Sequence, residues 1–174
     1  MDAQNTAASW LSDEEAMRAR LAEPGVAGLD KLRGSSGLEF LQGIGNGDLP
    51  PAPMLELLGM TPIAVSEGRT LFQGRPGAQH FNPSGSVHGG YAATLLDTAV
   101  GCAVHSCLPP GKGYTTLELK VNFIRALSDK TGPIRAEGRV INVGGQIGIA
   151  EGRITDANGK LYAHATTTCL IFPI

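Results

Sequence analysis

The sequence predicts an α+β domain in which an antiparallel sheet wraps around one long, largely buried helix. Residues 91 to about 106 are rich in Ala and Leu and lack the alternation of a strand, which predicts the helix. Residues 116–123, 134–143, 147–155 and 161–172 follow as strand-like segments. No other helix of similar length is predicted, so this helix must bury its faces against the sheet.

Short patterns predict the individual strands and turns. Residues 63–65 and 70–72 flank Glu67-Gly68, which predicts a hairpin before the long helix. Asn158-Gly159 predicts a type I′ turn between the last two strands. A strand with one buried face is predicted where polar residues alternate with the apolar Leu117, Leu119, Val121 and Phe123.

Residues 1–55 are predicted to form a helical extension, and residues 56–174 the main domain. Ser12 and Glu15 have the spacing of a capping box, which predicts a short helix that continues to about Ala22. No residue of the extension matches a motif that carries chemistry. The extension therefore receives no functional role from the sequence.

A second short helix of the extension is predicted after Ser36. The glycines within residues 43–47 and the prolines within residues 50–53 are predicted to break the chain after it. The extension contains eight acidic and four basic residues, a balance that disfavours a DNA-binding arm. Because residues 1 to about 30 are polar and interrupted by Pro and Gly, we expect them to be dispensable for chemistry.

The composition predicts one cytoplasmic domain. At 174 residues and 42% hydrophobic content, the chain can form a sizeable core. The net charge of −2 gives no sign of a nucleic-acid or anionic-membrane partner. The N-terminus lacks the basic and apolar regions of a signal peptide. The cysteines, odd in number and without metal-type spacing, are expected to be free thiols in a reducing compartment: Cys102, Cys107 and Cys169.

Asp97 is the strongest single indication of a functional site. It is the only Asp, Glu, Lys or Arg between Arg75 and Lys112, and its neighbours on the predicted helix are small or apolar. A carboxylate in such surroundings is costly unless something compensates it. It is therefore paired with a distant arginine, open to water at the flank of the helix, or used in chemistry.

The segment before the helix ends in His88-Gly89-Gly90. Two glycines in the first turn allow a ligand to approach bare backbone. The first N–H groups of a helix lack internal partners and lie at the positive end of its dipole, so they can bind a developing oxyanion. The alternative interpretation is a sharp turn with a structural histidine at the helix start.

Taken together, Asn82, His88-Gly89-Gly90, Asp97 nine residues after the histidine, and a strand with Thr115-Thr116 resemble the hotdog-fold thioesterases. Within them the set is most similar to the phenylacetic-acid-degradation branch, which acts on hydroxyphenylacetyl-CoA and related acyl-CoAs. The resemblance extends from about Pro53 to the C-terminus. It implies a curved antiparallel sheet around one helix, in agreement with the prediction from the patterns.

The resemblance also implies a role for each matching residue. Asp97 is implied to be the nucleophile or the general base for water, and the Gly89 N–H to polarise the thioester carbonyl. Asn82 and His88 are implied to orient the thioester and the attacking group. Thr116 matches a hydroxyl that holds the aspartate or the water.

Further residues are implied to bind substrate: Gly90, Gly144, Gly145 and Thr115, which could also take the place of Thr116. In many members of the family that the chain resembles, the loop that carries Gly144 and Gly145 has Arg or Lys, which are implied to bind the CoA phosphates, but here it has none. In the family the site lies at a dimer interface. One subunit provides the aspartate and the hydroxyl, and the other provides the asparagine, histidine and glycine.

The resemblance implies hydrolysis of an aryl-acyl or medium-chain acyl-CoA to free acid and CoA by a homodimer or homotetramer, in the degradation of aromatic compounds. No metal or redox cofactor is needed, and the four histidines show no metal-ligand spacing. A non-catalytic acyl-thioester-binding module would be expected to lack the acidic residue or to carry a DNA-binding domain. A hotdog dehydratase would pair a histidine with an acid in another arrangement. The presence of Asp97 favours the hydrolase.

Overall fold

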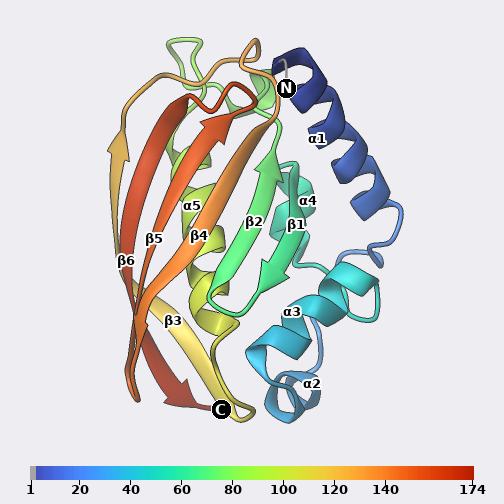
Figure 1. The fold of residues 1–174 in the computed structure, drawn as a ribbon, viewed down its shortest axis with the longest axis vertical. Coiled ribbons are helices and arrows are strands. Elements are labelled where there is room, and N and C mark those ends of the chain that lie inside the picture. Colours follow the sequence, from blue (N-terminus) through green and yellow to red (C-terminus); the bar gives the residue numbers. More distant parts are fainter. Residues whose placement is uncertain (1–2) are drawn as a thin grey trace.

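A computed structural model describes residues 3–174 and has the α+β hotdog architecture predicted from the sequence (Figure 1). Six antiparallel strands form one sheet in the order β1-β2-β4-β5-β6-β3, curved around helix α5 (Gly89–His105). The strands are β1 (Met60–Ser66), β2 (Arg69–Gly74), β3 (Lys112–Phe123), β4 (Ile134–Val143), β5 (Ile147–Asp156) and β6 (Leu161–Pro173). The hairpin of β1 and β2 and the late run of strands are confirmed.

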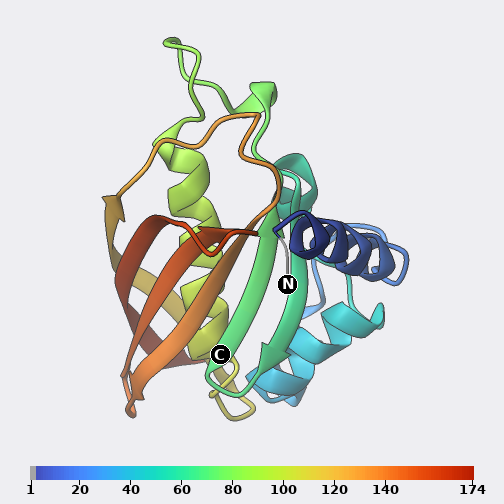
Figure 2. The ribbon, with the colours of Figure 1, turned by 45° about the horizontal axis from the view of Figure 1, so that its top comes forward.

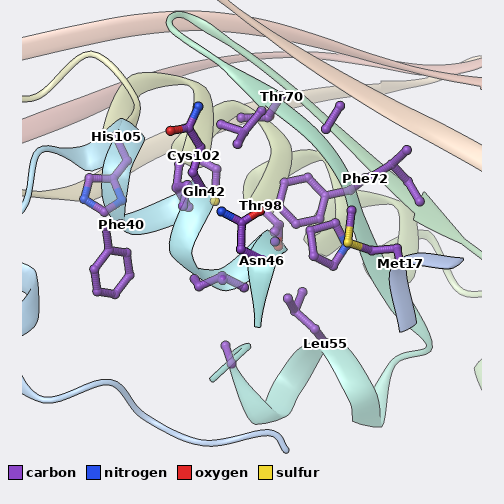
Figure 3. Close-up of a pocket in the computed structure, with 18 of the residues that line it drawn as sticks. Met17, Phe40, Gln42, Asn46, Leu55, Thr70, Phe72, Thr98, Cys102 and His105 are labelled. Carbon is purple, nitrogen blue, oxygen red and sulfur yellow. The ribbon is translucent and has the colours of Figure 1, made fainter. Parts of the chain in front are cut away.

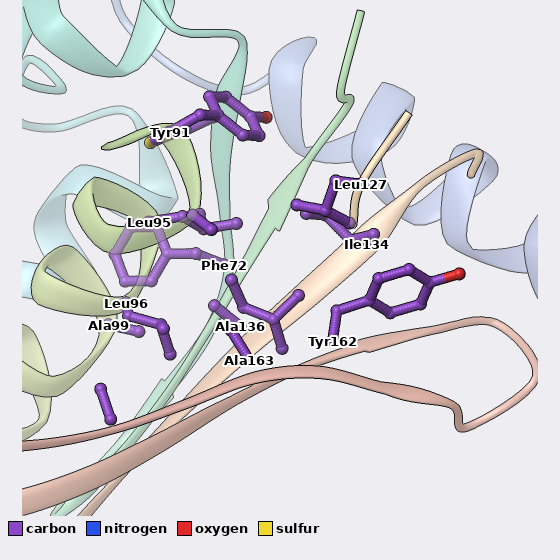
Figure 4. Close-up of a cluster of buried hydrophobic side chains, with 14 of the residues drawn as sticks. Phe72, Tyr91, Leu95, Leu96, Ala99, Leu127, Ile134, Ala136, Tyr162 and Ala163 are labelled. Carbon is purple, nitrogen blue, oxygen red and sulfur yellow. The ribbon is translucent and has the colours of Figure 1, made fainter. Parts of the chain in front are cut away.

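Helix α5 forms the centre of the core. Its inner face is fully buried through Leu95, Leu96 and Ala99, which meet Phe72, Ala136 and Ala163 of the sheet (Figure 4). A Cβ at Gly138 of β4 would overlap the backbone at Ala99, so glycine is what lets the sheet approach the helix this closely. Burying each leucine stabilises the fold by about 1.5–3 kcal/mol.

One prediction for strand β3 is wrong. Leu117 and Phe123 are 57% and 58% exposed, although they were expected on the buried face. Phe123 is in phase with Leu119 and Val121 and is exposed as the last residue of the strand. Leu117 is exposed because a β-bulge between Thr116 and Glu118 inserts it as an extra residue and shifts the alternation by one. Thr116 therefore lies on the same inner face as Leu119.

Four helices precede the sheet: α1 (Ala3–Arg18), α2 (Leu29–Gly34), α3 (Gly37–Asn46) and α4 (Pro53–Leu57). Helices α1, α3 and α4 pack against β1, along one edge of the sheet (Figures 1 and 2). Ser12 was expected to cap the first helix, but it lies in the middle of α1, which already ends at Arg18 rather than near Ala22. The preceding segment contains the good helix formers Ala3, Ala7, Ala8 and Leu11, and the helix extends backwards past Ser12.

Glu14 anchors α1 to the sheet. Its side chain is completely buried and accepts hydrogen bonds from Arg18 at 3.0 Å, Arg75 at 2.6 Å and Gln73 at 2.8 Å. Burial alone would raise the pKa of this carboxyl, but the hydrogen bonds from Arg75 and Arg18 outweigh it and hold the pKa below its usual value. Glu14 is thus an ionised, well-paired structural group.

Helix α3 begins where the sequence predicts but is longer than expected. Ser36 and Glu39 form a capping box at its start. The glycines at 43 and 45 lie inside the helix, which ends only at Gly47, a left-handed C-cap with φ of 84°. The predicted break at residues 43–47 is therefore confined to its last residue.

The turn after β5 also differs from the prediction. Only Gly159 has a positive φ there, whereas a type I′ turn would need one at Asn158 as well. Asp156 accepts hydrogen bonds from the N–H groups of Asn158 and Lys160, and this stabilises the alternative turn. Among residues 3–174, no helix combines the length and the apolar character that crossing a membrane requires.

Candidate active site

Asp97 lies half-buried on the face of α5 that the sheet leaves open. The hydroxyl of Thr116 on β3 donates a hydrogen bond to its Oδ1 at 2.9 Å. Within residues 3–174, no arginine or lysine forms an ion pair with Asp97, and no other side chain bonds to it. The interpretation as one half of a structural ion pair is therefore excluded for the described chain. The second carboxylate oxygen is available to a ligand.

Asp97 and Thr116 line a cavity of about 520 Å³. This volume is typical of small-molecule sites. Its other walls come from β1, from β2, and from helices α1, α3 and α4. Figure 3 shows other residues of its lining, with Phe40 and His105 at one end of the cavity and Met17, Phe72 and Leu55 at the other.

The end of the cavity near Phe40 is aromatic. The ring of His105 lies 5.6 Å from that of Phe40 and 5.3 Å from that of Tyr114. Burial lowers the pKa of His105 and raises that of Tyr114, so both are neutral near pH 7. Burial also raises the pKa of the Cys102 thiol to about 12, so this cysteine is not a thiolate nucleophile.

The first turn of α5 has the geometry expected of an anion-binding helix start. His88 is the N-cap, and its Nδ1 accepts the N–H of Gly90 at 2.8 Å. The carbonyl of His88 accepts the N–H of Tyr91 at 3.0 Å. Gly89 is the first helical residue, a position whose N–H has no acceptor within the helix. The Gly89 N–H is therefore the donor that this turn leaves for a ligand.

Asn82 shapes the loop before the helix. Its Oδ1 accepts the N–H groups of Ser84 and Ser86 at 2.9 and 3.2 Å, and its Nδ2 donates to the hydroxyl of Ser86 at 2.9 Å. The loop projects beyond the body of the molecule (Figure 2). Asn82 thus fixes the approach of the chain to His88 and Gly89.

The two halves of the predicted site lie apart in a single chain. Gly89 and Asp97 are separated by eight residues of α5, or about 12 Å along the helix axis. Gly89 lies instead against the ring of Phe123, which a Cβ at this position would approach to 3.2 Å. One subunit alone does not place the Gly89 N–H and the Asp97 carboxylate around one carbonyl group.

The remaining predicted residues lie outside the cavity. Thr115 is exposed on β3, and its neighbour Thr116 is the hydroxyl that reaches Asp97. Gly144 and Gly145 form the tight turn between β4 and β5, where the Gly144 N–H donates to Ile147. In the chain from residue 3 onward, no three His, Cys, Asp or Glu side chains gather as a metal site.

The N-terminal extension lines part of the cavity, a contribution that was not predicted from the sequence. Phe40, Leu41 and Ile44 of α3 line it, together with Met17 of α1. The spacing of Phe40, Leu41 and Ile44 after a capping-box serine is typical of an amphipathic helix with one packed face. That pattern was present in the sequence, but the surface on which it packs was not predictable from it.

Comparisons with known proteins agree with the fold. Residues 84–163 match the family described as Thioesterase superfamily. A solved phenylacetic acid degradation-related protein of Ralstonia eutropha is 27% identical, with a TM-score of 0.67 over 78% of this chain and 98% of that chain. The 1,4-dihydroxy-2-naphthoyl-CoA hydrolase of Listeria monocytogenes is 24% identical over 67% of this chain and 93% of that protein.

Three archaeal relatives are named as esterases. A Halobacterium salinarum protein is 42% identical, but the match covers 41% of this chain and 47% of that protein. The chain spans about half the length of the first curated relatives that it matches, 47% and 57%. A Saccharolobus solfataricus protein is 30% identical over 64% of this chain and 78% of its own length. This similarity, together with the matched family region and the hotdog architecture, shows that the chain belongs to the thioesterase superfamily.

Proposed function

We propose that the chain is the subunit of an acyl-CoA thioesterase in which Asp97 performs the hydrolytic step. The observation that carries this proposal is the position of Asp97. It is a carboxylate without a cationic partner among residues 3–174, held by Thr116 in a cavity of about 520 Å³. A partly buried charge whose desolvation free energy is not offset by a partner in the fold is a candidate for a catalytic group.

The proposed reaction needs no group beyond the protein and water. Asp97 removes a proton from water as the water oxygen attacks the thioester carbonyl carbon. Negative charge develops on the carbonyl oxygen, where a backbone N–H stabilises it. The C–S bond then breaks, and the proton on Asp97 passes to the departing CoA thiolate. In the alternative route the Asp97 carboxylate attacks the carbonyl, the C–S bond breaks to expel the CoA thiolate, and a mixed anhydride forms. Water then cleaves the anhydride to the free acid, which restores the Asp97 carboxylate and provides the proton that the thiolate takes up.

The carbonyl-polarising N–H is assigned to Gly89 of a second subunit. The strand β3 is a free edge of the sheet and exposes the large apolar side chains Leu117 and Phe123. An exposed edge of this kind favours pairing with another strand. We propose that two copies pair antiparallel along β3, as in an isologous dimer.

This pairing would complete the site. In an antiparallel register that sets Thr116 opposite Phe123 of the partner subunit, both side chains keep to the inner face of the sheet. Gly89 packs against Phe123 within its own chain, so the partner's Gly89 would arrive beside Thr116 and Asp97. Within one chain Gly89 and Asp97 are about 12 Å apart along the helix axis. In the dimer each Asp97 would instead be paired with the Gly89 N–H of the other subunit.

For the substrate we propose an aryl-acyl or medium-chain acyl-CoA, and a role in aromatic compound degradation. The names of the Listeria and Ralstonia relatives support an aromatic acyl group, and the former names CoA as the carrier. A purely acyl-thioester-binding module would have no use for the unpaired Asp97, and no observation specifically favours a dehydratase.

Hydrolysis assays across short, medium, long and aryl acyl-CoAs test the proposal through release of free thiol. We expect turnover of at least one apolar acyl-CoA, and light scattering should give a dimer or a dimer of dimers. A folded protein that binds acyl-CoA but hydrolyses none would support the binding module instead. A fully active monomer would contradict the shared site.

A further inference from the structure

The strongest unassigned feature is the side of the cavity opposite Asp97. One wall is the open face of α5, where Asp97, Thr98 and Cys102 lie one after another along the helix. The facing wall is provided by the N-terminal extension, through the apolar stripe Phe40, Leu41 and Ile44 of α3. The residues proposed for catalysis and the N-terminal extension therefore line the same cavity.

Specific contacts hold α3 in this position. The capping box of Ser36 and Glu39 fixes its first turn. The N–H of Gly37 donates to the carbonyl of Leu108 at 2.9 Å, and a Cβ at Gly37 would overlap the carbonyl of His105. The start of α3 is thus fitted to the end of α5, and the stripe that follows is aimed at the cavity rather than at solvent.

The polarity of the cavity matches an acyl thioester. Near the proposed reaction centre its polar groups are Asp97, Thr98 and Thr116, and α3 adds its apolar stripe together with Gln42 and Asn46. When the thioester carbonyl is beside Asp97, the acyl group must occupy the space beyond it. From Asp97 to the end wall at His105 the helix advances about 12 Å. This length suits a medium-chain or aryl acyl group better than an acetyl group.

We propose that the α3 stripe of the N-terminal extension forms the wall of the acyl pocket and determines which acyl groups the protein accepts. This inference rests on the function proposed above, because it places the acyl group by reference to Asp97. The residue assigned to specificity is Ile44. Phe40 also contacts His105 and so holds α3 in place, which makes it a poorer probe of the pocket.

The test measures binding of S-alkyl-CoA thioethers of increasing chain length, which lack the carbonyl and resist hydrolysis. Each methylene that enters an apolar pocket strengthens binding about fourfold until the pocket is full. For the wild type we expect this rise to stop at a medium chain. Ile44 lies on the side wall before the His105 end wall, so Ile44→Ala should give the chain more side space and move the limit to a longer chain. Ile44→Trp should block the same path and move the limit to a shorter chain.

Leu38→Ala is the matched control, since Leu38 is a half-buried residue of the same helix that does not line the cavity. It should leave the length limit unchanged. Identical profiles for the wild type, Ile44→Ala and Ile44→Trp, with normal thermal melts, would overturn the inference.

Hydrolysis of the corresponding acyl-CoAs, measured in parallel, separates this inference from the proposed function. If the thioether profiles shift while no acyl-CoA is hydrolysed, the assignment of α3 to the wall of the acyl pocket is supported and the thioesterase function is contradicted. If acyl-CoA is hydrolysed but the binding profiles of both Ile44 variants match the wild type, the thioesterase function is supported and the assignment of α3 to the pocket wall is contradicted.

Discussion

Two carboxylates in this chain, Glu14 and Asp97, have contrasting surroundings. Glu14 is completely buried, yet two arginines and a glutamine satisfy it. Asp97 is only half-buried, but its single side-chain partner within residues 3–174 is the neutral hydroxyl of Thr116. The more deeply buried charge is the better compensated one. The difference indicates that Glu14 serves the fold and that Asp97 is available for chemistry.

The largest expected effect tests the Asp97 side of this contrast. Asp97→Asn keeps the size of the side chain and an oxygen that can accept from Thr116, so the melting temperature should change little. The negative charge and its basicity are lost, and general-base catalysis alone is worth about 10²–10⁴ in rate. We expect a loss of this size in acyl-CoA hydrolysis, followed by thiol release.

Glu151→Gln is the matched control for Asp97→Asn, because it makes the same change on β5, outside the cavity. It should retain the wild-type rate. The loss of a general base should leave about a hundredth of the wild-type rate or less. If Asp97→Asn retains more than about a tenth of that rate, Asp97 is structural.

The Glu14 side of the contrast predicts a loss of stability instead. Glu14→Ala removes charged hydrogen bonds from Arg18 and Arg75. Both arginines are nearly half exposed and can return to water, so the cost should be about 1.5–3 kcal/mol rather than that of a fully buried pair. Chemical denaturation measures it, with the exposed neighbour Glu15→Ala as control. Equal stability of the two variants would show that Glu14 does not anchor α1.

The pH dependence of stability sharpens the same point. The folded pKa of Glu14 lies below its usual value of 4.5, so its stabilising effect is complete above pH 4.5 and is lost as the pH falls through the folded pKa. Thermal melts between about pH 3 and 7 should therefore show a gap between wild type and Glu14→Gln that narrows on acidification. A gap that stays constant over this range would mean that the carboxylate charge is not what anchors the helix.

The contrast between the carboxylates also marks what the sequence could predict. Asp97 and His88-Gly89-Gly90 are local features, recognisable because a lone charge and paired glycines are unusual within an apolar helix. The buried role of Glu14 depends on Arg75 and Gln73, which lie about sixty residues further along the chain. No local pattern contains that information, and the nearby Ser12 suggested a helix start instead.

The same distinction applies to the sheet and the cavity. The order and bounds of most strands followed from strand-like segments and the turns between them, but the bulge at Leu117 did not, because a bulge changes the register without changing the residue pattern. It decides that Thr116 faces Asp97. The wall formed by α3 depends on the fit of Gly37 against the end of α5, another contact between distant segments.

The smallest expected effect distinguishes the two neighbouring threonines. Thr116→Ala removes one hydrogen bond to the Asp97 carboxylate, which should cost about 1.5 kcal/mol, or roughly a tenfold loss in rate. Thr115 is exposed and its side chain makes no hydrogen bond within residues 3–174, so Thr115→Ala should cost less. Rates for both variants should be measured with the same acyl-CoA, beside thermal melts. Since the bulge at Leu117 is what turns Thr116 inward, a larger loss for Thr115→Ala would show that the register of β3 at the site differs from the one described.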